Sequence, residues 1–242
     1  MKTHTKRPFT FPILALSAWL LAGNGFAADL QARDGASAIA AAHFEAGVAA
    51  YESNDPARAF KEFLAAANNG HADSQFNLAL MYERGIGVDK DEKHALAWYG
   101  KSAAQGNADA QFNLGVLYEN GRGSKIDYAK ANAWYRKASA QGDALAIGNL
   151  GMLYVRGQGV RENKIAGIAL LLVSAAMDQS PENHARQNIS ATRGLTAGMI
   201  SAAQTLSKEL SSAQNLLVTL DQYLKKAPAA AGSSANSISG KH

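Results

Sequence analysis

The sequence predicts an all-α fold, a right-handed α-solenoid of stacked helix-turn-helix repeats. The chain matches itself at intervals of 36 residues, which separate Gly70, Gly106 and Gly142, and a period of this length is typical of stacked helical repeats. Within each interval, apolar residues recur at helical spacing and glycines follow each helical stretch. A single unit of this size cannot bury its own apolar face, so the units are expected to stack and share one core.

Each unit is expected to begin with a helix that is capped by a carboxylate or amide side chain. The caps, again 36 residues apart, are Asp55, Asp91, Asp127 and Asn163. Their side-chain oxygens can accept from the free N–H groups of the first turn, and Pro56 suits a first helical position, which needs no donor. One face of these helices is expected to be buried. It consists of Ala59, Phe63, Ala66, Ala95, Tyr99, Ser102, Ala131, Tyr135 and Ala138.

The second helix of each unit is expected to lie between two glycines. The first glycine ends the preceding helix in the left-handed conformation, and the second closes the new helix in the same way. The three helices are expected to start at His71, Asn107 and Asp143 and to end before Gly85, Gly121 and Gly157. Their inward residues are expected to be Leu78, Met81, Tyr82, Leu114, Leu117, Tyr118, Leu150, Leu153 and Tyr154.

A pair of glycines in the pattern G-x-G follows each second helix. The pairs are Gly85/Gly87, Gly121/Gly123 and Gly157/Gly159. A phosphate-binding loop of the dinucleotide type needs a third glycine and a preceding strand, and both are missing here. Because the pair recurs in every unit, we expect it to close the repeat rather than to bind phosphate.

The segment from Ala95 to Asp127 reads ALAWYGKSAAQGNADAQFNLGVLYENGRGSKID. Its paired aromatics, its A-A-x-x-G and A-x-x-x-L-G-x-x-Y stretches and its G-x-G resemble the Sel1-like repeat family, a branch of the tetratricopeptide solenoids. The resemblance covers about 57–159 and weakens over 163–178, where Leu170 and Leu171 replace the aromatic pair. It implies a scaffold that binds another protein as an adaptor, regulator or assembly factor. The partners that it suggests are envelope components or membrane sensor kinases.

The N-terminus has the three features of a secretory signal peptide, over residues 1–27. Lys2, Lys6 and Arg7 precede an apolar stretch, residues 9–22, that is too short for a comfortable membrane span. Small residues at Gly25 and Ala27 favour cleavage before Ala28. We therefore expect export to a bacterial periplasm, with no membrane insertion after cleavage.

The remaining chain divides by its repeats and its composition. We expect a tetratricopeptide-like helical region at 28–54, repeats at 55–90, 91–126 and 127–162, and a degenerate fourth repeat at 163–190. Capping helices are expected at 191–226. Residues 227–242 are rich in Ala, Ser and Gly, which favours a disordered tail.

Composition argues against several function classes. The chain has 24 basic and 20 acidic residues, and loss of the signal peptide removes three basic residues, which leaves 21 against 20 and a net charge of +1. Such a chain lacks the basic surface that nucleic-acid binding needs. It has no cysteine, which excludes disulfides and a lipid anchor on cysteine. We find no nucleophile motif and no metal-ligand spacing, so we expect no enzyme activity, catalytic residue, metal or cofactor.

A cationic strip is the candidate partner-binding site. The repeat register places Arg58, His94 and Lys130 in one column along the first helices. Lys101 and Lys137 form a neighbouring column, with Lys61 nearby. Such a strip could receive an acidic segment of a partner, although exposed lysines can also serve only as solvated surface.

Trp98 and Trp134 occupy the same place in successive units. They can pack between helices as core residues, which we favour, or form an aromatic ladder that stacks on sugar rings. The second interpretation would make the chain a cell-wall or polysaccharide-binding module. A cell-wall hydrolase is a third and weaker alternative.

The C-terminal region carries an apolar seam with the spacing of about three heptads. It consists of Ala203, Leu206, Leu210, Ala213, Leu217, Leu220 and Leu224. The seam could cap the open end of the solenoid, or residues 203–224 could pair with a second copy as a homodimer. Ser211 and Ser212 could also divide it into two shorter helices.

Overall fold

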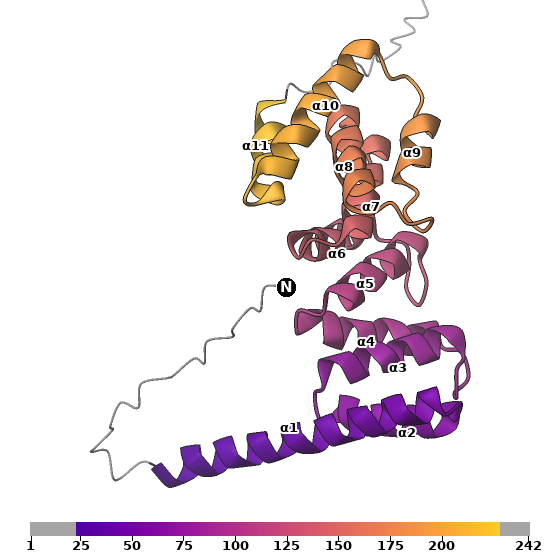
Figure 1. The fold of residues 1–242 in the computed structure, drawn as a ribbon, viewed down its shortest axis with the longest axis vertical. Coiled ribbons are helices and arrows are strands. Elements are labelled where there is room, and N and C mark those ends of the chain that lie inside the picture. Colours follow the sequence, from indigo (N-terminus) through magenta and orange to yellow (C-terminus); the bar gives the residue numbers. More distant parts are fainter. Residues whose placement is uncertain (1–22, 228–242) are drawn as a thin grey trace, which may run out of the picture.

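The computed structural model describes residues 23–227, and the regular elements within this range are all α-helices. Residues 1–22 and 228–242, which hold most of the expected signal peptide and nearly all of the expected tail, lie outside the described residues. Each helix through α8 packs chiefly against its neighbours in the chain, so the helices form a stack (Figure 1). The predicted all-α solenoid is confirmed.

The stack alternates two kinds of helix, which we call the A helix and the B helix of each unit. The A helices are α2 (Pro56–Asn68), α4 (Glu92–Ala104), α6 (Tyr128–Ala140) and α8 (Lys164–Met177). The B helices are α3 (Ala72–Arg84), α5 (Ala108–Asn120) and α7 (Ala144–Arg156). Helix α1 (Gly23–Glu52) precedes them, and α9 (Ala185–Ala191), α10 (Ala197–Ser212) and α11 (Leu216–Lys226) follow.

The predicted caps hold the helix starts. The Asp127 carboxylate accepts from the Lys130 amide at 2.9 Å, and the Asn107 side chain accepts from the Ala110 amide at 2.8 Å. The other predicted caps of the A and B helices make equivalent bonds. Because every unit fixes its helix starts in the same way, successive units present the same faces to one another.

The second glycine of each G-x-G pair lies against the A helix of its own unit. Gly123 has a φ of +70°, and a Cβ there would lie 2.2 Å from the carbonyl oxygen of Glu92, at the start of α4. Gly87 approaches Pro56 equally closely at the start of α2. Only glycine permits both the positive φ and this approach. The pair therefore closes the repeat, as predicted.

The predicted stripe of the A helices is buried along its whole length. Among the inward residues predicted for the B helices, two tyrosines differ. Tyr82 and Tyr118 are only half-buried, because each lies at the edge of the core under a residue of the next A helix. His94 stacks on Tyr82 with ring centroids 5.0 Å apart, and the Lys130 ammonium lies 5.0 Å from the Tyr118 ring centroid.

Partly buried side-chain hydrogen bonds connect one unit to the next. The Gln105 amide donates to Gln75 Oε1 at 2.7 Å, and Gln141 donates to Gln111 Oε1 at 2.8 Å. Ser102 donates to the Ala72 carbonyl oxygen at 2.8 Å. Since these bonds join groups 30 residues apart, they fix the spacing of the units in addition to the apolar contacts.

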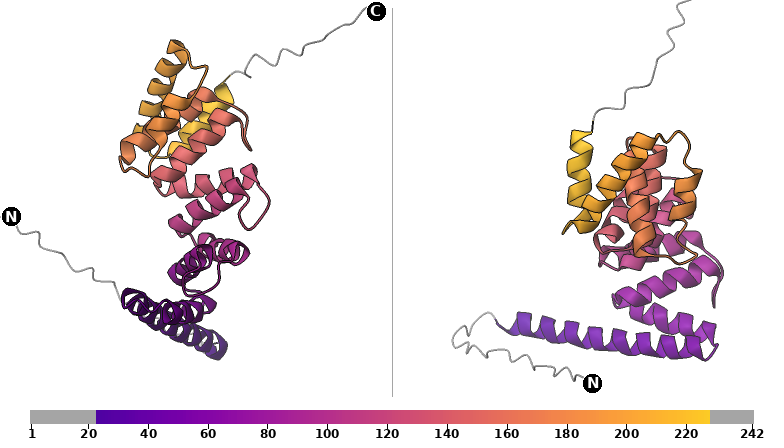
Figure 2. Two further views of the ribbon diagram at one scale, coloured as in Figure 1. Left: turned by 90° about the vertical axis from the view of Figure 1, so that its right-hand side faces the viewer. Right: turned by 45° about the horizontal axis from the view of Figure 1, so that its top comes forward.

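Helix α1 takes the place of a B helix before the first unit, and its N-terminal part projects beyond the stack (Figures 1 and 2). It runs through the expected cleavage point before Ala28. Residues 53–55 join it to α2, whereas residues 85–91 join α3 to α4. Because the connection before α2 is the shorter one, α1 is shifted along α2 by about one helical turn relative to the position of a B helix. With this shift, Gly47 of α1 lies against the Phe63 ring, just as Gly115 of α5 lies against the Tyr135 ring.

The C-terminal helices close the stack. Helices α9 and α10 pack on α8, and α11 packs on α10 and on α6. The seam is not one long helix, because α10 ends at Ser212 and Asn215 caps α11; the alternative of two shorter helices is correct. Leu206, Leu210 and Leu220 are buried in the chain's own core. Within this chain the seam therefore packs as a cap on the end of the stack.

Over the described range, none of the helices combines the length and the apolar character that crossing a membrane requires.

Candidate functional site

The most regular surface feature is a lysine that lies on a tryptophan, repeated on neighbouring A helices. Lys101 Nζ lies 3.5 Å from the ring centroid of Trp98, and Lys137 Nζ lies 3.8 Å from that of Trp134. Both lysines are exposed. An ammonium group over an indole ring is attracted by the negative ring face, so each charge is held at a defined place on the surface.

The column of Arg58, His94 and Lys130 carries less free positive charge than its residue types suggest. His94 Nδ1 lies 2.7 Å from the Asp91 carboxylate, and Lys130 Nζ lies 3.3 Å from the Asp127 carboxylate. The backbone amides of the same two residues bond to these carboxylates and hold the pKa of each aspartate below its usual value. The N-cap aspartates are therefore ionised at neutral pH and offset the positive column.

The N-terminal members of the strip differ again. Arg58 and Lys61 are exposed on α2, and the Arg58 amide donates to its cap Asp55 at 3.0 Å. Glu62 stands at the place of the two tryptophans and lies 2.7 Å from His43 of α1. The first unit thus has no lysine on a tryptophan, and within residues 23–227 that arrangement occurs on α4 and α6 alone.

The tryptophans themselves pack as core residues. Trp98 exposes only 8% of its surface and lies in the apolar cluster of the first two units, and Trp134 packs against the same cluster. Lys101 and Lys137 lie over the two rings. The geometry therefore does not favour an aromatic ladder for stacking on sugars.

One polar cluster was not foreseen from the sequence. Arg122, in the loop after α5, donates to Glu83 of α3 at 2.7 Å and to Glu92 of α4 at 3.0 Å. Tyr99 donates to the other oxygen of Glu83 at 2.6 Å. Hydrogen bonds from Arg122 and, to a smaller extent, from Lys90 lower the pKa of the Glu92 carboxyl. Burial and, after it, the bond to Glu83 raise the pKa of the Tyr99 phenol. Every member has a partner, so this cluster is a structural connection between units.

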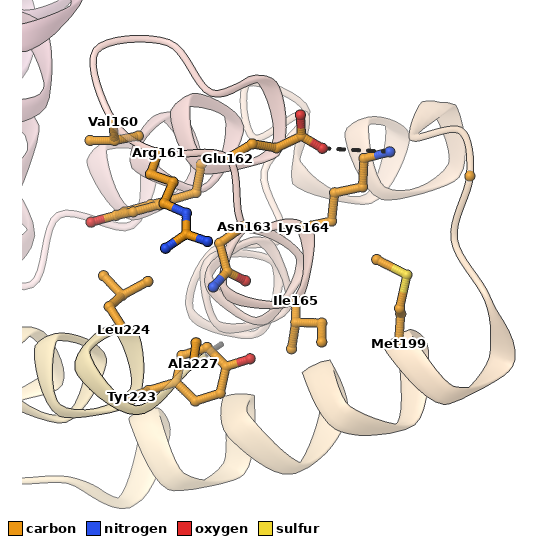
Figure 3. Close-up of a pocket in the computed structure, with 12 residues that line it drawn as sticks. Val160, Arg161, Glu162, Asn163, Lys164, Ile165, Met199, Tyr223, Leu224 and Ala227 are labelled. Atoms are coloured by element: carbon orange, nitrogen blue, oxygen red, sulfur yellow. Dashed lines mark ion pairs between the residues drawn. The ribbon is translucent and has the colours of Figure 1, made fainter. Parts of the chain in front are cut away.

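A cavity of about 600 Å³ lies at the C-terminal end of the stack (Figure 3). The start of α8 contributes Asn163 and Ile165, α10 contributes Met199, and the end of α11 contributes Tyr223 and Leu224. The surface of this cavity is mostly apolar, and the residues that line it include no serine, threonine, cysteine or histidine that could act as a nucleophile with a neighbouring base. Within the described part of the chain, His, Cys, Asp and Glu side chains form no group of three that could hold a metal ion.

Comparison with known proteins identifies the repeats. The Sel1 repeat matches residues 72–107, 108–143 and 144–178. Each matched segment begins with a B helix and ends with the following A helix, and the third includes α8.

A solved structure shows the same arrangement. A Sel1 repeat protein from Oxalobacter formigenes is 26% identical, with a TM-score of 0.55 over 78% of this chain and 88% of that one. The protective antigen c5321 of uropathogenic Escherichia coli, which has an SLR fold, is 26% identical with a TM-score of 0.44, over 81% of this chain and 50% of that one.

A curated relative matches a shorter segment. The rat (Rattus norvegicus) protein DAP3-binding cell death enhancer 1 is 44% identical over 50 residues, which are 21% of this chain. The match spans 10% of that relative's length. The chain is thus a Sel1 repeat protein over its three consecutive matched repeats, which stand in an all-helical stack like that of the Oxalobacter formigenes protein, and Sel1 repeats generally mediate protein interactions.

Proposed function

We propose that this chain is an exported, non-enzymatic scaffold that binds an acidic segment of another protein in the periplasm. Its role would be that of an adaptor or regulator, and its partner an envelope component or a membrane sensor kinase. The expected signal peptide supports export, and the stacked repeats support a binding role, because repeat proteins present extended surfaces.

The two lysines that lie on tryptophans carry the proposal. Lys101 and Lys137 are exposed, equivalent in successive units and held over Trp98 and Trp134. A charge that is fixed in place loses less conformational entropy on binding than a freely rotating lysine. Two such charges along the stack match a partner segment with carboxylates at a similar spacing.

Charge reversal tests this surface. In cells that express the chain, crosslinking followed by mass spectrometry would identify the proteins attached to the wild type and to Lys101→Glu/Lys137→Glu. We expect the variant to lose a partner whose capture by the wild type falls with added salt. The matched control is Lys208→Glu/Lys225→Glu, which reverses two exposed lysines on α10 and α11. If the variant and the control retain the same partners as the wild type, the lysine surface is not the binding site.

Export has its own test. The mature protein is expected in the periplasmic fraction, and N-terminal sequencing should find Ala28 as its first residue. Retention of the uncleaved chain in the cytoplasm would contradict this part of the proposal.

A further inference from the structure

Helix α11 turns back onto the A-helix side of the stack. It follows α10 after a short turn, and it contacts α6, an A helix 76 or more residues earlier in the chain. Arg136 Nη2 of α6 donates to Asp221 Oδ2 of α11 at 2.6 Å. Leu220, one residue before Asp221, is fully buried. An amphipathic helix of this chain thus already occupies part of the surface that A helices present.

The packing of α11 is incomplete. Leu220 is the one residue of the helix that is fully buried, whereas α10 buries Ala203, Leu206 and Leu210. Val218 of α11 exposes 51% of its surface. The cavity of about 600 Å³ opens between the end of α11 and the starts of α8 and α10 (Figure 3). Leu216, Leu217, Tyr223 and Leu224 pack against the core but are only partly buried, and a helix that buries a single side chain completely can open locally.

The α6 surface is more polar than the equivalent surfaces of the earlier units. Arg136 stands where the same register gives Leu64 in α2 and Gly100 in α4. One turn earlier, Asn132 replaces the apolar residues of α2 and α4, and its amide nitrogen is buried without a partner among the described residues. The α6 surface therefore carries two side-chain donors, Arg136 and Asn132, and α11 bonds only to Arg136. A carboxylate could accept a hydrogen bond from either donor.

We propose that α11 is an internal ligand of α6, which an amphipathic helix of a partner protein replaces. That helix would present apolar residues at i, i+3 or i+4, like Leu220, Tyr223 and Leu224, and a carboxylate toward Arg136. Such a competitor gains what α11 lacks, namely a bond to Asn132 and apolar contacts in the neighbouring cavity. The inference rests on the proposed function, because it assumes that the A-helix face binds proteins.

Hydrogen exchange of the full chain tests whether α11 opens by itself. We expect its amides to exchange faster than those of α8 and α10, and faster still in Asp221→Arg, which places two guanidinium groups together. The exchanged pair Arg136→Asp/Asp221→Arg should restore protection. If α11 exchanges only together with α8 and α10, it is a permanent part of the core and the proposal is wrong.

A peptide of residues 214–227 tests whether the α6 surface accepts a helix in trans. Binding of the labelled peptide to the full chain is measured by fluorescence anisotropy. Full-length Asp221→Arg, which weakens its own α11 but keeps Arg136, should bind the peptide roughly fivefold or more tightly than the wild type, since less internal competition remains. Arg136→Glu should bind it no better than the wild type. Equal binding by Asp221→Arg and the wild type would overturn the proposal.

Neither experiment needs the partner, so their outcome is independent of the lysine reversal above. Protected α11 amides and absent peptide binding would refute internal competition while leaving the scaffold function in place. An unchanged partner list for Lys101→Glu/Lys137→Glu would instead count against the scaffold surface.

Discussion

Tyr135 donates its hydroxyl hydrogen to the Glu119 carboxylate at 2.6 Å, across the boundary between the second and third units. Tyr99 makes the same bond to Glu83 one unit earlier. Both tyrosine side chains are fully buried, and burial together with the neighbouring carboxylate raises the pKa of each phenol. Partly buried hydrogen bonds that require a protonated tyrosine thus connect the units.

Alkaline pH should therefore weaken the stack. The folded state holds these two protons above the ordinary tyrosine pKa of about 10, whereas the unfolded chain releases them. Stability is fully present below that pH and is lost as the pH rises toward the folded pKa values. Thermal unfolding followed by circular dichroism should show this loss in the wild type and a smaller one in Tyr99→Phe/Tyr135→Phe.

The double variant also loses two hydrogen bonds at neutral pH, each worth about 1 kcal/mol. Tyr51→Phe is the matched control, because it removes the hydroxyl of an exposed tyrosine. An equal alkaline loss in the double variant and the wild type would mean that these phenols are not the groups responsible.

Gly123→Ala should destabilise the protein through backbone strain and overlap. The new Cβ would lie 2.2 Å from the Glu92 carbonyl oxygen, at a φ of +70°. We expect a loss of about 2 kcal/mol or more in the free energy of unfolding, measured by urea denaturation. Gly100→Ala is the control, since no atom lies near the added Cβ within helix α4, and it should stabilise the protein by about 0.5–1 kcal/mol. A neutral Gly123→Ala would show that the loop can move away from α4.

The two B-helix core positions of the second unit should differ in cost. Leu114 is 2% exposed, so Leu114→Ala should cost about 2–5 kcal/mol in the free energy of unfolding. Tyr118 is half-buried beneath Lys130, so Tyr118→Ala should cost less than Leu114→Ala. Urea denaturation of both variants gives the comparison. A larger cost at Tyr118 would place the core closer to the Lys130 side than the structure does.

The elements that the sequence predicts well are those set by local chemistry. An N-cap such as Asp127 or a closing glycine such as Gly121 acts within one turn of its own helix. Its effect can therefore be read from neighbouring residues alone. The 36-residue period then carries each assignment to the other units, which is why the buried stripe was correct from α2 to α6.

The features that the sequence did not reveal depend on contacts between distant residues. Arg122 reaches Glu83, 39 residues earlier, and Arg136 pairs with Asp221, 85 residues later. Nothing local indicates either pair. The repeat register did contain one usable signal, because a glutamate stands 16 residues before both Tyr99 and Tyr135, and that pairing could have been inferred.

The cationic strip likewise depends partly on the repeat register and partly on side-chain contacts that the sequence does not reveal. The register gives His94 and Lys130 equivalent positions in successive units, yet it does not show that Asp91 and Asp127 fold back on them. Nor does it show that Lys101 and Lys137 lie over the tryptophans three residues before them. Those facts depend on side-chain direction at a surface, where several rotamers are open to a long side chain.

The N-cap of α7, Asp143, can be tested by substitution with asparagine, the residue that caps the equivalent helix of the second unit. Its carboxylate accepts from the Ala146 amide at 2.7 Å, but burial, with the nearby Asp109 and Asp178, raises its pKa. Asn107 makes the equivalent cap in the second unit without a charge. Asp143→Asn should therefore keep the cap, remove the cost of the partly buried charge and raise the melting temperature at neutral pH.

The pH dependence of that gain follows from the direction of the shift. A raised folded pKa means that the contribution of Asp143 to stability is present below its unfolded pKa of about 3.9 and is lost as the pH rises through the folded value. The advantage of Asp143→Asn should thus appear at neutral pH and shrink in acid. Asp143→Ala, which removes the cap as well, should lower the free energy of unfolding by about 1 kcal/mol. If Asp143→Asn were as unstable as Asp143→Ala at neutral pH, the charge itself, acting on the helix dipole, would be what holds the start of α7.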